Sequence, residues 1–303
     1  MQNKKIFISG ATGFIGSHIA ELMLEQGFEV MALKRDISHL WRCSGFIDRI
    51  IWTNEDVWES EVIEFCPNII IHLAWEGIDA SDRENWEKQF NNIQLIFKLA
   101  SICKLVSVKK FIAFGSQAEY GLINGRVNES VNPEPNNAYA VAKIAAQKAL
   151  KILCEQNGVE WYWLRIFSVF GPRESKTWFI PMMITNLLDN VECRLTGCEQ
   201  QYDYIYVRDL ARMILTVLNN TYNHSGIYNI SSNGSKTLKS IITEINQIVN
   251  SKSKITFGAI PYRKNQSMHI EGNSELYRNT FGPFTYTDLN TALKETIDYY
   301  RLI

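Results

Sequence analysis

The sequence predicts an α/β protein with a doubly wound parallel sheet and a smaller α+β C-terminal domain. Two observations carry this prediction. In the first half of the chain, short apolar runs alternate with amphipathic helical patterns, which is typical of a parallel sheet covered by helices on both faces. Beyond Gly171-Pro172 the alternation becomes irregular. We expect residues 1–167 to form the first domain, residues 203–232 to return to it, and residues 168–303 to form mainly the second.

The elements follow from two periodicities, alternation for strands and a 3.6-residue repeat for helices. A strand over residues 5–8 leads into a helix on which Ile15, Ile19 and Met23 share one face. His18 on this helix is expected at the surface. The other predicted strands cover residues 29–33, 47–52, 68–73, 110–114, 160–166, 203–207, 227–230 and 254–257. The other predicted helices cover residues 56–65, 84–103, 138–156, 179–189, 208–219, 238–249 and 288–300.

Composition excludes several classes of protein. The 303 residues are 46% hydrophobic and 21% charged, so they can bury a full core. A net charge of -1 argues against nucleic acid or an anionic membrane as a partner. No apolar run reaches the length of a membrane span. The six cysteines include no CxxC pair, and the five histidines lack metal-ligand spacing. We therefore expect a cytoplasmic protein with free thiols and no metal.

A glycine-rich turn separates the first strand from the first helix. Its sequence is Gly10-Ala-Thr-Gly13-Phe-Ile-Gly16. Such a turn lets the backbone approach a pyrophosphate and aims the free N–H groups of the helix N-terminus at the phosphates. The turn therefore predicts a Rossmann-type dinucleotide site. Its expected cofactor contacts are Gly10, Thr12, Gly13, Phe14, Ile15 and Gly16.

The residues at the end of the second predicted strand indicate which dinucleotide the protein binds. NAD-binding folds usually place an acidic residue there to hold the ribose 2′-hydroxyl. This chain has Lys34-Arg35, which would attract a 2′-phosphate. The sequence therefore favours NADPH over NADH or NAD. The alternative is that both cations are solvated and Asp36 takes the acidic role in a shifted register.

Three residues form the predicted catalytic set. Tyr139 and Lys143 are four residues apart, so they share one face of a helix, and Ser116 ends the fifth predicted strand. The carboxyl ends of parallel strands face the cofactor crevice. An ammonium near a phenol stabilises the phenolate and lowers the pKa of the phenol. Ser116 can then hold a reacting oxygen while Tyr139 exchanges its proton and the cofactor exchanges hydride.

Together these motifs resemble the extended short-chain dehydrogenase/reductases, the nucleotide-sugar epimerases, dehydratases and reductases. The resemblance runs the whole length of the chain, through His72-Leu-Ala74, Arg165-Ile-Phe-Ser-Val-Phe-Gly171-Pro172, the segment 201–209 and Tyr228-Asn-Ile. It implies that Leu73, Ala74, Asn92 and Ile166 also contact the cofactor and that Lys143 holds the nicotinamide ribose. Arg165 is expected to be a structural ion-pair partner.

Departures from the family pattern favour one reaction. Dehydratases of this family have Thr-Asp-Glu where this chain has Ser116-Gln117-Ala118, and neither Gln nor Ala can transfer a proton. The resemblance is strongest to reductases of 4-keto-deoxy sugars from bacterial O-antigen (lipopolysaccharide) pathways. It implies an NADPH-dependent reductase of a nucleoside-diphosphate 4-keto-6-deoxy sugar. Candidate substrate contacts are Gln117, Ser168 and Arg263, the last for the pyrophosphate.

The sequence also allows two functions other than the reductase. The first is an NAD-dependent nucleotide-sugar 4-epimerase, because epimerases and reductases share the Ser/Tyr/Lys set. The second is a non-catalytic NADP-sensing protein on the same fold, although such relatives commonly lose the tyrosine or the lysine. The resemblance also implies a homodimer formed through the two long helices at 84–103 and 138–156. A stripe of Phe90, Ile93 and Phe97 on the first of these helices is compatible with such contact.

Overall fold

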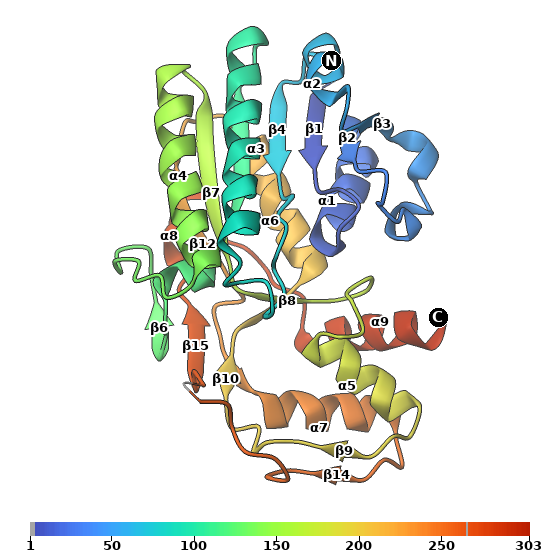
Figure 1. Cartoon of the computed structure of the whole chain (residues 1–303). Helices are drawn as coiled ribbons and strands as arrows, with labels where there is room; N and C mark the ends of the chain where they lie inside the picture. Colours follow the sequence, from blue (N-terminus) through green and yellow to red (C-terminus); the bar gives the residue numbers. More distant parts are fainter. Residues whose placement is uncertain (1–3, 265) are drawn as a thin grey trace.

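The computed structural model describes residues 4–264 and 266–303 and confirms the doubly wound parallel sheet (Figure 1). Within these residues, seven strands form the main sheet in the order β12-β7-β5-β4-β1-β2-β3. Every neighbouring pair in it is parallel. The strands are β1 (Lys5–Ser9), β2 (Glu29–Lys34), β3 (Ile51–Asn54), β4 (Ile69–His72), β5 (Lys110–Ser116), β7 (Glu160–Ile166) and β12 (Gly226–Ile230).

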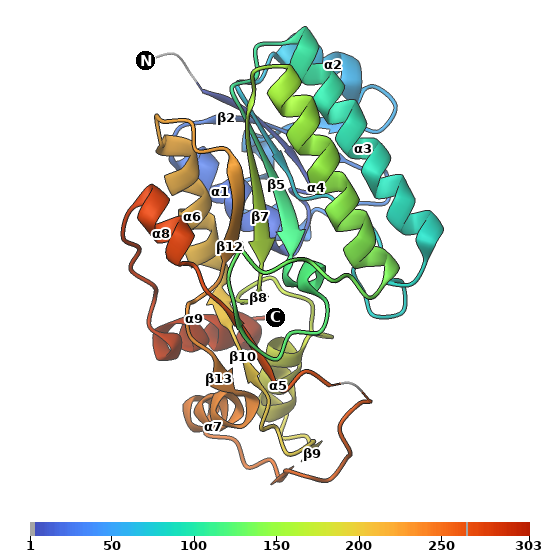
Figure 2. The same cartoon turned by 90° about the vertical axis from the view of Figure 1, so that its left-hand side faces the viewer.

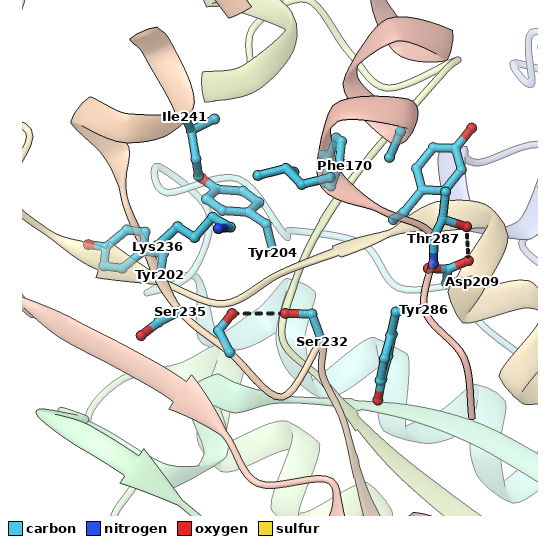
Figure 3. Close-up of a pocket in the computed structure, with 14 residues that line it drawn as sticks. Phe170, Tyr202, Tyr204, Asp209, Ser232, Ser235, Lys236, Ile241, Tyr286 and Thr287 are labelled. Carbon is cyan, nitrogen blue, oxygen red and sulfur yellow. Dashed lines mark hydrogen bonds between the residues drawn. The ribbon is translucent and has the colours of Figure 1, made fainter. Parts of the chain in front are cut away.

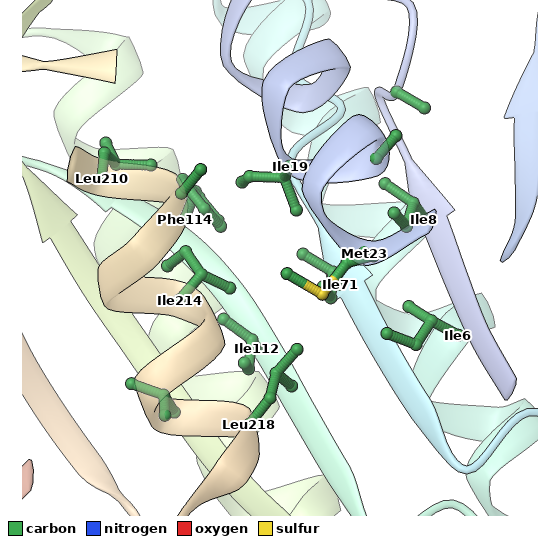
Figure 4. Packing of buried hydrophobic residues seen from close by; sticks show 14 of the residues in the cluster. Ile6, Ile8, Ile19, Met23, Ile71, Ile112, Phe114, Leu210, Ile214 and Leu218 are labelled. Atoms are coloured by element: carbon green, nitrogen blue, oxygen red, sulfur yellow. The ribbon is translucent and has the colours of Figure 1, made fainter. Parts of the chain in front are cut away.

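Helices cover both faces of this sheet (Figure 2). One face packs against α1 (Phe14–Glu25) and α6 (Val207–Asn219), and the other against α2 (Trp58–Phe65), α3 (Trp86–Leu105) and α4 (Ala138–Gln156). Successive strand residues serve opposite faces: Ile6 and Ile8 join the core under α1 and α6 (Figure 4), whereas Phe7 joins the other core. Burial on both faces explains why the strands read as continuous apolar runs.

A second, smaller set of elements lies beyond the carboxyl ends of the main strands (Figure 1). Helices α5 (Phe179–Leu188), α7 (Leu238–Val249) and α9 (Leu289–Arg301) share a separate hydrophobic core there. A four-stranded sheet has the order β13-β10-β15-β6, and two-stranded sheets pair β11 with β8 and β14 with β9. Their bounds are β6 (Gly125–Val127), β8 (Ser168–Phe170), β9 (Cys193–Arg194), β10 (Gln201–Tyr202), β11 (Tyr204–Tyr206), β13 (Lys236–Thr237), β14 (Ile255–Thr256) and β15 (His269–Gly272).

Three local predictions were wrong. Residues 47–52 are not one strand: Ile47–Arg49 form a 3₁₀ turn, and β3 begins only at Ile51. The turn carries Ile50 into the core under α1. In place of the predicted strand 203–207, β11 covers Tyr204–Tyr206, and α6 begins at Val207. His18 is buried, not exposed, because its Nε2 lies 2.8 Å from the Pro172 carbonyl oxygen.

Several short elements escaped prediction. They are β6, β8, β9, β10, β13, β15 and helix α8 (Glu275–Phe281), all seven residues long or shorter. A pattern that short is indistinguishable from a loop in the sequence. Within the described ranges, no helix is both long and apolar enough to cross a lipid bilayer.

Candidate active site

The glycine turn forms a tight cradle at the end of β1. Gly10 has φ of +86°, and a Cβ on it would lie 2.7 Å from the backbone nitrogen of Ala74. A Cβ on Gly16 would lie 2.0 Å from the Gly10 carbonyl oxygen. Helix α1 begins at Phe14, and no side chain of the described residues caps its N-terminus. The cradle therefore fits a phosphate-bearing group, because its N–H groups are uncapped and only glycines fit where the backbones meet.

The loop after β4 lies against this cradle. The N–H groups of Leu73 and Ala74 donate to the Ser9 carbonyl oxygen at 3.0 and 3.2 Å. The Ser9 hydroxyl lies 2.7 Å from Nδ1 of His72. Burial lowers the pKa of His72 to about 3, with the Lys143 charge as a smaller cause, so the ring stays neutral. Leu73 and Ala74 thus lie beside the glycine turn.

Asn92 is held by hydrogen bonds to the loop after β4 and to its own helix. Its amide nitrogen donates to the carbonyl oxygens of Glu76 and Lys88, each at 3.0 Å. Its amide oxygen accepts from the Glu76 N–H at 2.8 Å. These bonds occupy the buried side chain and tie the loop after β4 to α3. In this structure Asn92 positions the loop beside the cradle.

Lys34 and Arg35 lie at the same edge of the sheet as the cradle. The register pairs Ser9 of β1 with Leu33 of β2, so Lys34 is the next residue along. Lys34 is half-buried and Arg35 is exposed. In the part of the chain that the structure describes, neither side chain forms an ion pair with a carboxylate. Both cations are therefore available to an anionic group at this edge.

The three predicted catalytic residues converge at the end of β5. Lys143 Nζ donates to the Phe114 carbonyl oxygen at 2.7 Å and lies 5.7 Å from the centroid of the Tyr139 ring. Burial raises the pKa of Tyr139, and a hydrogen bond with Ser116 opposes that effect. Burial lowers the pKa of Lys143 to about 7. Ile166 lies next to Ser116 in the strand register.

Glu119 and Arg165 form a buried ion pair that contacts Ser116. Glu119 Oε2 accepts from Arg165 Nε at 2.8 Å, and the two side chains are 0% and 3% exposed. Glu119 Oε1 accepts from the Ser116 N–H at 2.8 Å and from Trp163 Nε1 at 2.9 Å. The structural role expected of Arg165 agrees with this geometry. Because every bond of Glu119 points into the core, its carboxylate is committed to structure.

The candidate substrate residues are less closely grouped. Gln117 adjoins Ser116, and its Oε1 is buried with no hydrogen-bond partner among the described residues. Ser168 begins β8 and is partly exposed. Arg263 is exposed between β14 and β15, and its charge opposes the effect of burial, which raises the pKa of Tyr202. The described contacts do not connect Arg263 to the catalytic set.

Sequence reasoning missed a cavity of about 290 Å³ in the smaller part of the molecule (Figure 3). Its lining residues include Tyr202, Tyr204, Tyr206, Ser232 and Tyr286. The alternation of tyrosines was the available signal. Ser116, Tyr139 and Lys143 do not line this cavity. It is therefore separate from the catalytic set.

Arg83 and Trp75 lie in the loop after β4 and were not among the predicted site residues. The structure places Arg83 over the Tyr139 ring and Trp75 over the Lys143 ammonium. No motif marks either position, because both lie in an irregular loop. Only the three-dimensional contact reveals them.

The fold and the cradle define a dinucleotide-binding protein of the Rossmann class. The model of the NAD dependent epimerase/dehydratase family matches residues 6–231. The chain belongs to this family.

Known relatives differ in their reactions. CDP-abequose synthase of Salmonella muenchen is 27% identical over 284 residues, which cover 90% of each chain. dTDP-D-glucose 4,6-dehydratase of Mus musculus is 25% identical and covers 98% of this chain and 89% of its own. The solved UDP-N-acetylglucosamine 4-epimerase of Methanobrevibacter ruminantium has a TM-score of 0.89 at 24% identity, covering 100% and 99% of the two chains. This chain is therefore similar to a synthase and a dehydratase in sequence and to an epimerase in fold.

Proposed function

We propose that this enzyme is an NADPH-dependent reductase of a nucleoside-diphosphate 4-keto-6-deoxy sugar. The observation that carries the proposal is the grouping of Ser116, Tyr139 and Lys143 at the end of β5. This set can polarise and protonate a ketone oxygen. The cradle and the two cations after β2 supply the means to bind a phosphorylated dinucleotide.

Different residues bind different parts of the cofactor. The N–H groups of the turn from Gly10 to Gly16 hold the pyrophosphate, and Lys34 and Arg35 hold the 2′-phosphate. Leu73, Ala74 and Ile166 line the site, while Asn92 keeps the loop after β4 in place. When bound, NADPH supplies the hydride.

The catalytic side chains act on the oxygen of the ketone. Ser116 donates a hydrogen bond to this oxygen, which draws electron density away from C4. Tyr139 donates its proton to the same oxygen, and Lys143 makes the phenol a better acid. The unpartnered Oε1 of Gln117 accepts a hydrogen bond from a sugar hydroxyl, and Ser168 and Arg263 contact the rest of the substrate. Burial keeps Tyr139 protonated at neutral pH, as a proton donor requires.

Dehydration fits this site poorly. Eliminating water needs an acid and a base beside Ser116, and the chain has Gln117 and Ala118 there. Glu119 is the nearest carboxylate in sequence, and it is held in the core by Arg165. The similarity to CDP-abequose synthase supports a deoxy-sugar substrate. An NAD-dependent 4-epimerase is the second candidate, since the solved UDP-glucuronic acid 4-epimerase of Bacillus cereus has this fold and binds NAD.

A cofactor titration separates the two candidates. The protein is stripped of nucleotide, the released nucleotide is identified, and NADPH and NADH are titrated by fluorescence. We expect little retained nucleotide and a clear preference for NADPH. Replacing both Lys34 and Arg35 with Ala should weaken NADPH binding far more than NADH binding. Retained NAD without NADPH preference would support the epimerase instead.

A panel of 4-keto sugar nucleotides then tests the reaction itself. NADPH oxidation that depends on one of them supports the reductase. If none is reduced and a nucleotide sugar is instead epimerised without net NADPH oxidation, the proposed reaction is wrong. Binding of neither cofactor would point to a protein without this activity.

A further inference from the structure

One loop covers the catalytic pair and contacts both of its members. This covering loop, residues 75–85, connects β4 to α3. Gln89, which is 0% exposed, holds it in place. The Gln89 amide nitrogen donates to the Gly77 and Asp82 carbonyl oxygens at 2.8 and 3.3 Å. The amide oxygen of Gln89 accepts from Trp75 Nε1 at 2.8 Å. The loop is therefore fixed at several points.

Arg83 of the covering loop lies over the catalytic tyrosine. Its guanidinium carbon is 5.2 Å from the centroid of the Tyr139 ring. The Tyr139 N–H donates to the Arg83 carbonyl oxygen at 2.9 Å, and Arg83 Nε donates to the Ile78 carbonyl oxygen at 3.0 Å. Among residues 4–264 and 266–303, no carboxylate forms an ion pair with Arg83. Its charge thus lies over the Tyr139 ring and is not neutralised by an ion pair among these residues.

Lys143 alone is a weak source of positive charge for Tyr139. Its Nζ lies 3.5 Å from the centroid of the Trp75 ring, an attractive contact for an ammonium. Even so, burial lowers the pKa of Lys143 to about 7, so the ammonium loses its proton as pH rises above neutral. A guanidinium stays protonated throughout this range. Arg83 therefore keeps its charge where Lys143 does not.

The remaining titratable groups near Tyr139 do not replace this charge. Glu119 is negative and raises the pKa of Tyr139, although Arg165 holds it in an ion pair. His72, behind Lys143, is neutral because burial lowers its pKa to about 3. The Arg83 guanidinium lowers the pKa of Tyr139.

We propose that Arg83 is a positioning residue that supplies Tyr139 with a second, permanent positive charge, so that proton transfer does not depend on Lys143 alone. The proposal rests on the proposed function only in taking Tyr139 as the proton donor. It assigns to the covering loop an electrostatic role in addition to its packing. It also predicts a pH range in which Arg83 matters most, above the pKa of Lys143.

The first test needs no substrate. Ultraviolet difference spectra follow phenol ionisation in wild type, Arg83→Gln and Arg83→Lys, each measured against the same protein carrying Tyr139→Phe. The difference isolates the signal of Tyr139. We expect Arg83→Gln to raise its titration midpoint by roughly one pH unit and Arg83→Lys to restore most of the shift. An unchanged midpoint in a folded Arg83→Gln protein would overturn the proposal.

The second test measures turnover between pH 6 and 9. Wild type should retain activity above pH 7, whereas Arg83→Gln should lose kcat several-fold more at pH 9 than at pH 6, with little change in KM. Arg301→Gln, an exposed guanidinium on α9, serves as the control. A higher KM with an unchanged pH profile would make Arg83 a substrate contact and contradict the proposal. If wild type reduces no 4-keto sugar, the proposed function fails, and the ultraviolet titration still decides the role of Arg83.

Discussion

At the scale of single residues, the side chains that do chemistry are few and buried. Tyr139 and Lys143 are 7% and 4% exposed, and burial moves their two pKa values in opposite directions. Desolvation favours the neutral form of each group, so the phenol keeps its proton and the amine gives its proton up more readily. The site therefore combines a tyrosine that keeps its proton with a lysine that is charged only below its lowered pKa.

Tyr139→Phe tests the proton donor. The ring still fits its place under Trp75, so we expect normal folding and a loss of turnover of at least about 100-fold, the range for removing a general acid. NADPH oxidation and a thermal melt measure the two effects. Tyr222→Phe, on a side chain 73% exposed, is the matched control. Wild-type turnover in Tyr139→Phe would refute the catalytic assignment.

Glu119→Gln tests the ion pair beneath Ser116. Removing the negative charge leaves Arg165 buried without a counter-charge, which costs about 3–5 kcal/mol. Chemical denaturation should show this loss in the free energy of unfolding. Glu59→Gln breaks the exposed pair with Lys98, whose side chains are 48% and 54% exposed, and should cost under about 1 kcal/mol. Equal losses in the two variants would contradict a structural role for Glu119.

At the scale of elements, the glycine turn joins a strand, a helix and a neighbouring loop. The Gly10 and Gly16 backbones approach so closely that a methyl group does not fit between them. Gly16→Ala should therefore displace α1 and abolish detectable NADPH binding in a fluorescence titration. In Gly45→Ala the new methyl meets nothing within 4 Å, so binding should stay intact. If Gly16→Ala binds NADPH as wild type does, the cradle does not hold the pyrophosphate.

The sequence predicted the elements that have a long, regular period. The bounds of α4, β7 and α7 agree with the prediction because each element is long enough for its hydrophobic periodicity to be recognised. Strands of two to four residues, such as β8 and β15, owe their pairing to partners far along the chain. Likewise, Ser116, Tyr139 and Lys143 could be predicted from motifs at strand and helix ends. Arg83 could not, since nothing in an irregular loop shows what its side chain will contact.

At the scale of the whole molecule, two predictions remain to be tested. The division into residues 1–167 with 203–232 and residues 168–303 is one. Assembly is the other: α3 and α4 leave Phe90, Phe97 and Ile152 exposed by 63%, 49% and 54%. Such large exposed apolar side chains on neighbouring helices favour contact with a second copy of the chain.

Phe97→Glu tests this assembly. A carboxylate at the centre of the α3 surface cannot be buried without a partner, so it should shift a dimer toward monomer in sedimentation velocity. Ile260→Glu, on a side chain 46% exposed far along the chain, is the control and should leave the mass unchanged. A wild-type protein that sediments as a monomer would exclude the predicted homodimer.

The position of β12 has a consequence for synthesis on the ribosome. β12 pairs with β7, yet it follows β7 by about 60 residues. At a synthesis rate of about 5–20 residues per second, one edge of β7 stays unpaired for roughly 3 to 12 s. An unpaired edge beside Trp161 and Trp163 is a template for aggregation. We expect chains stalled between β7 and β12 to depend on chaperones more than the full-length chain does.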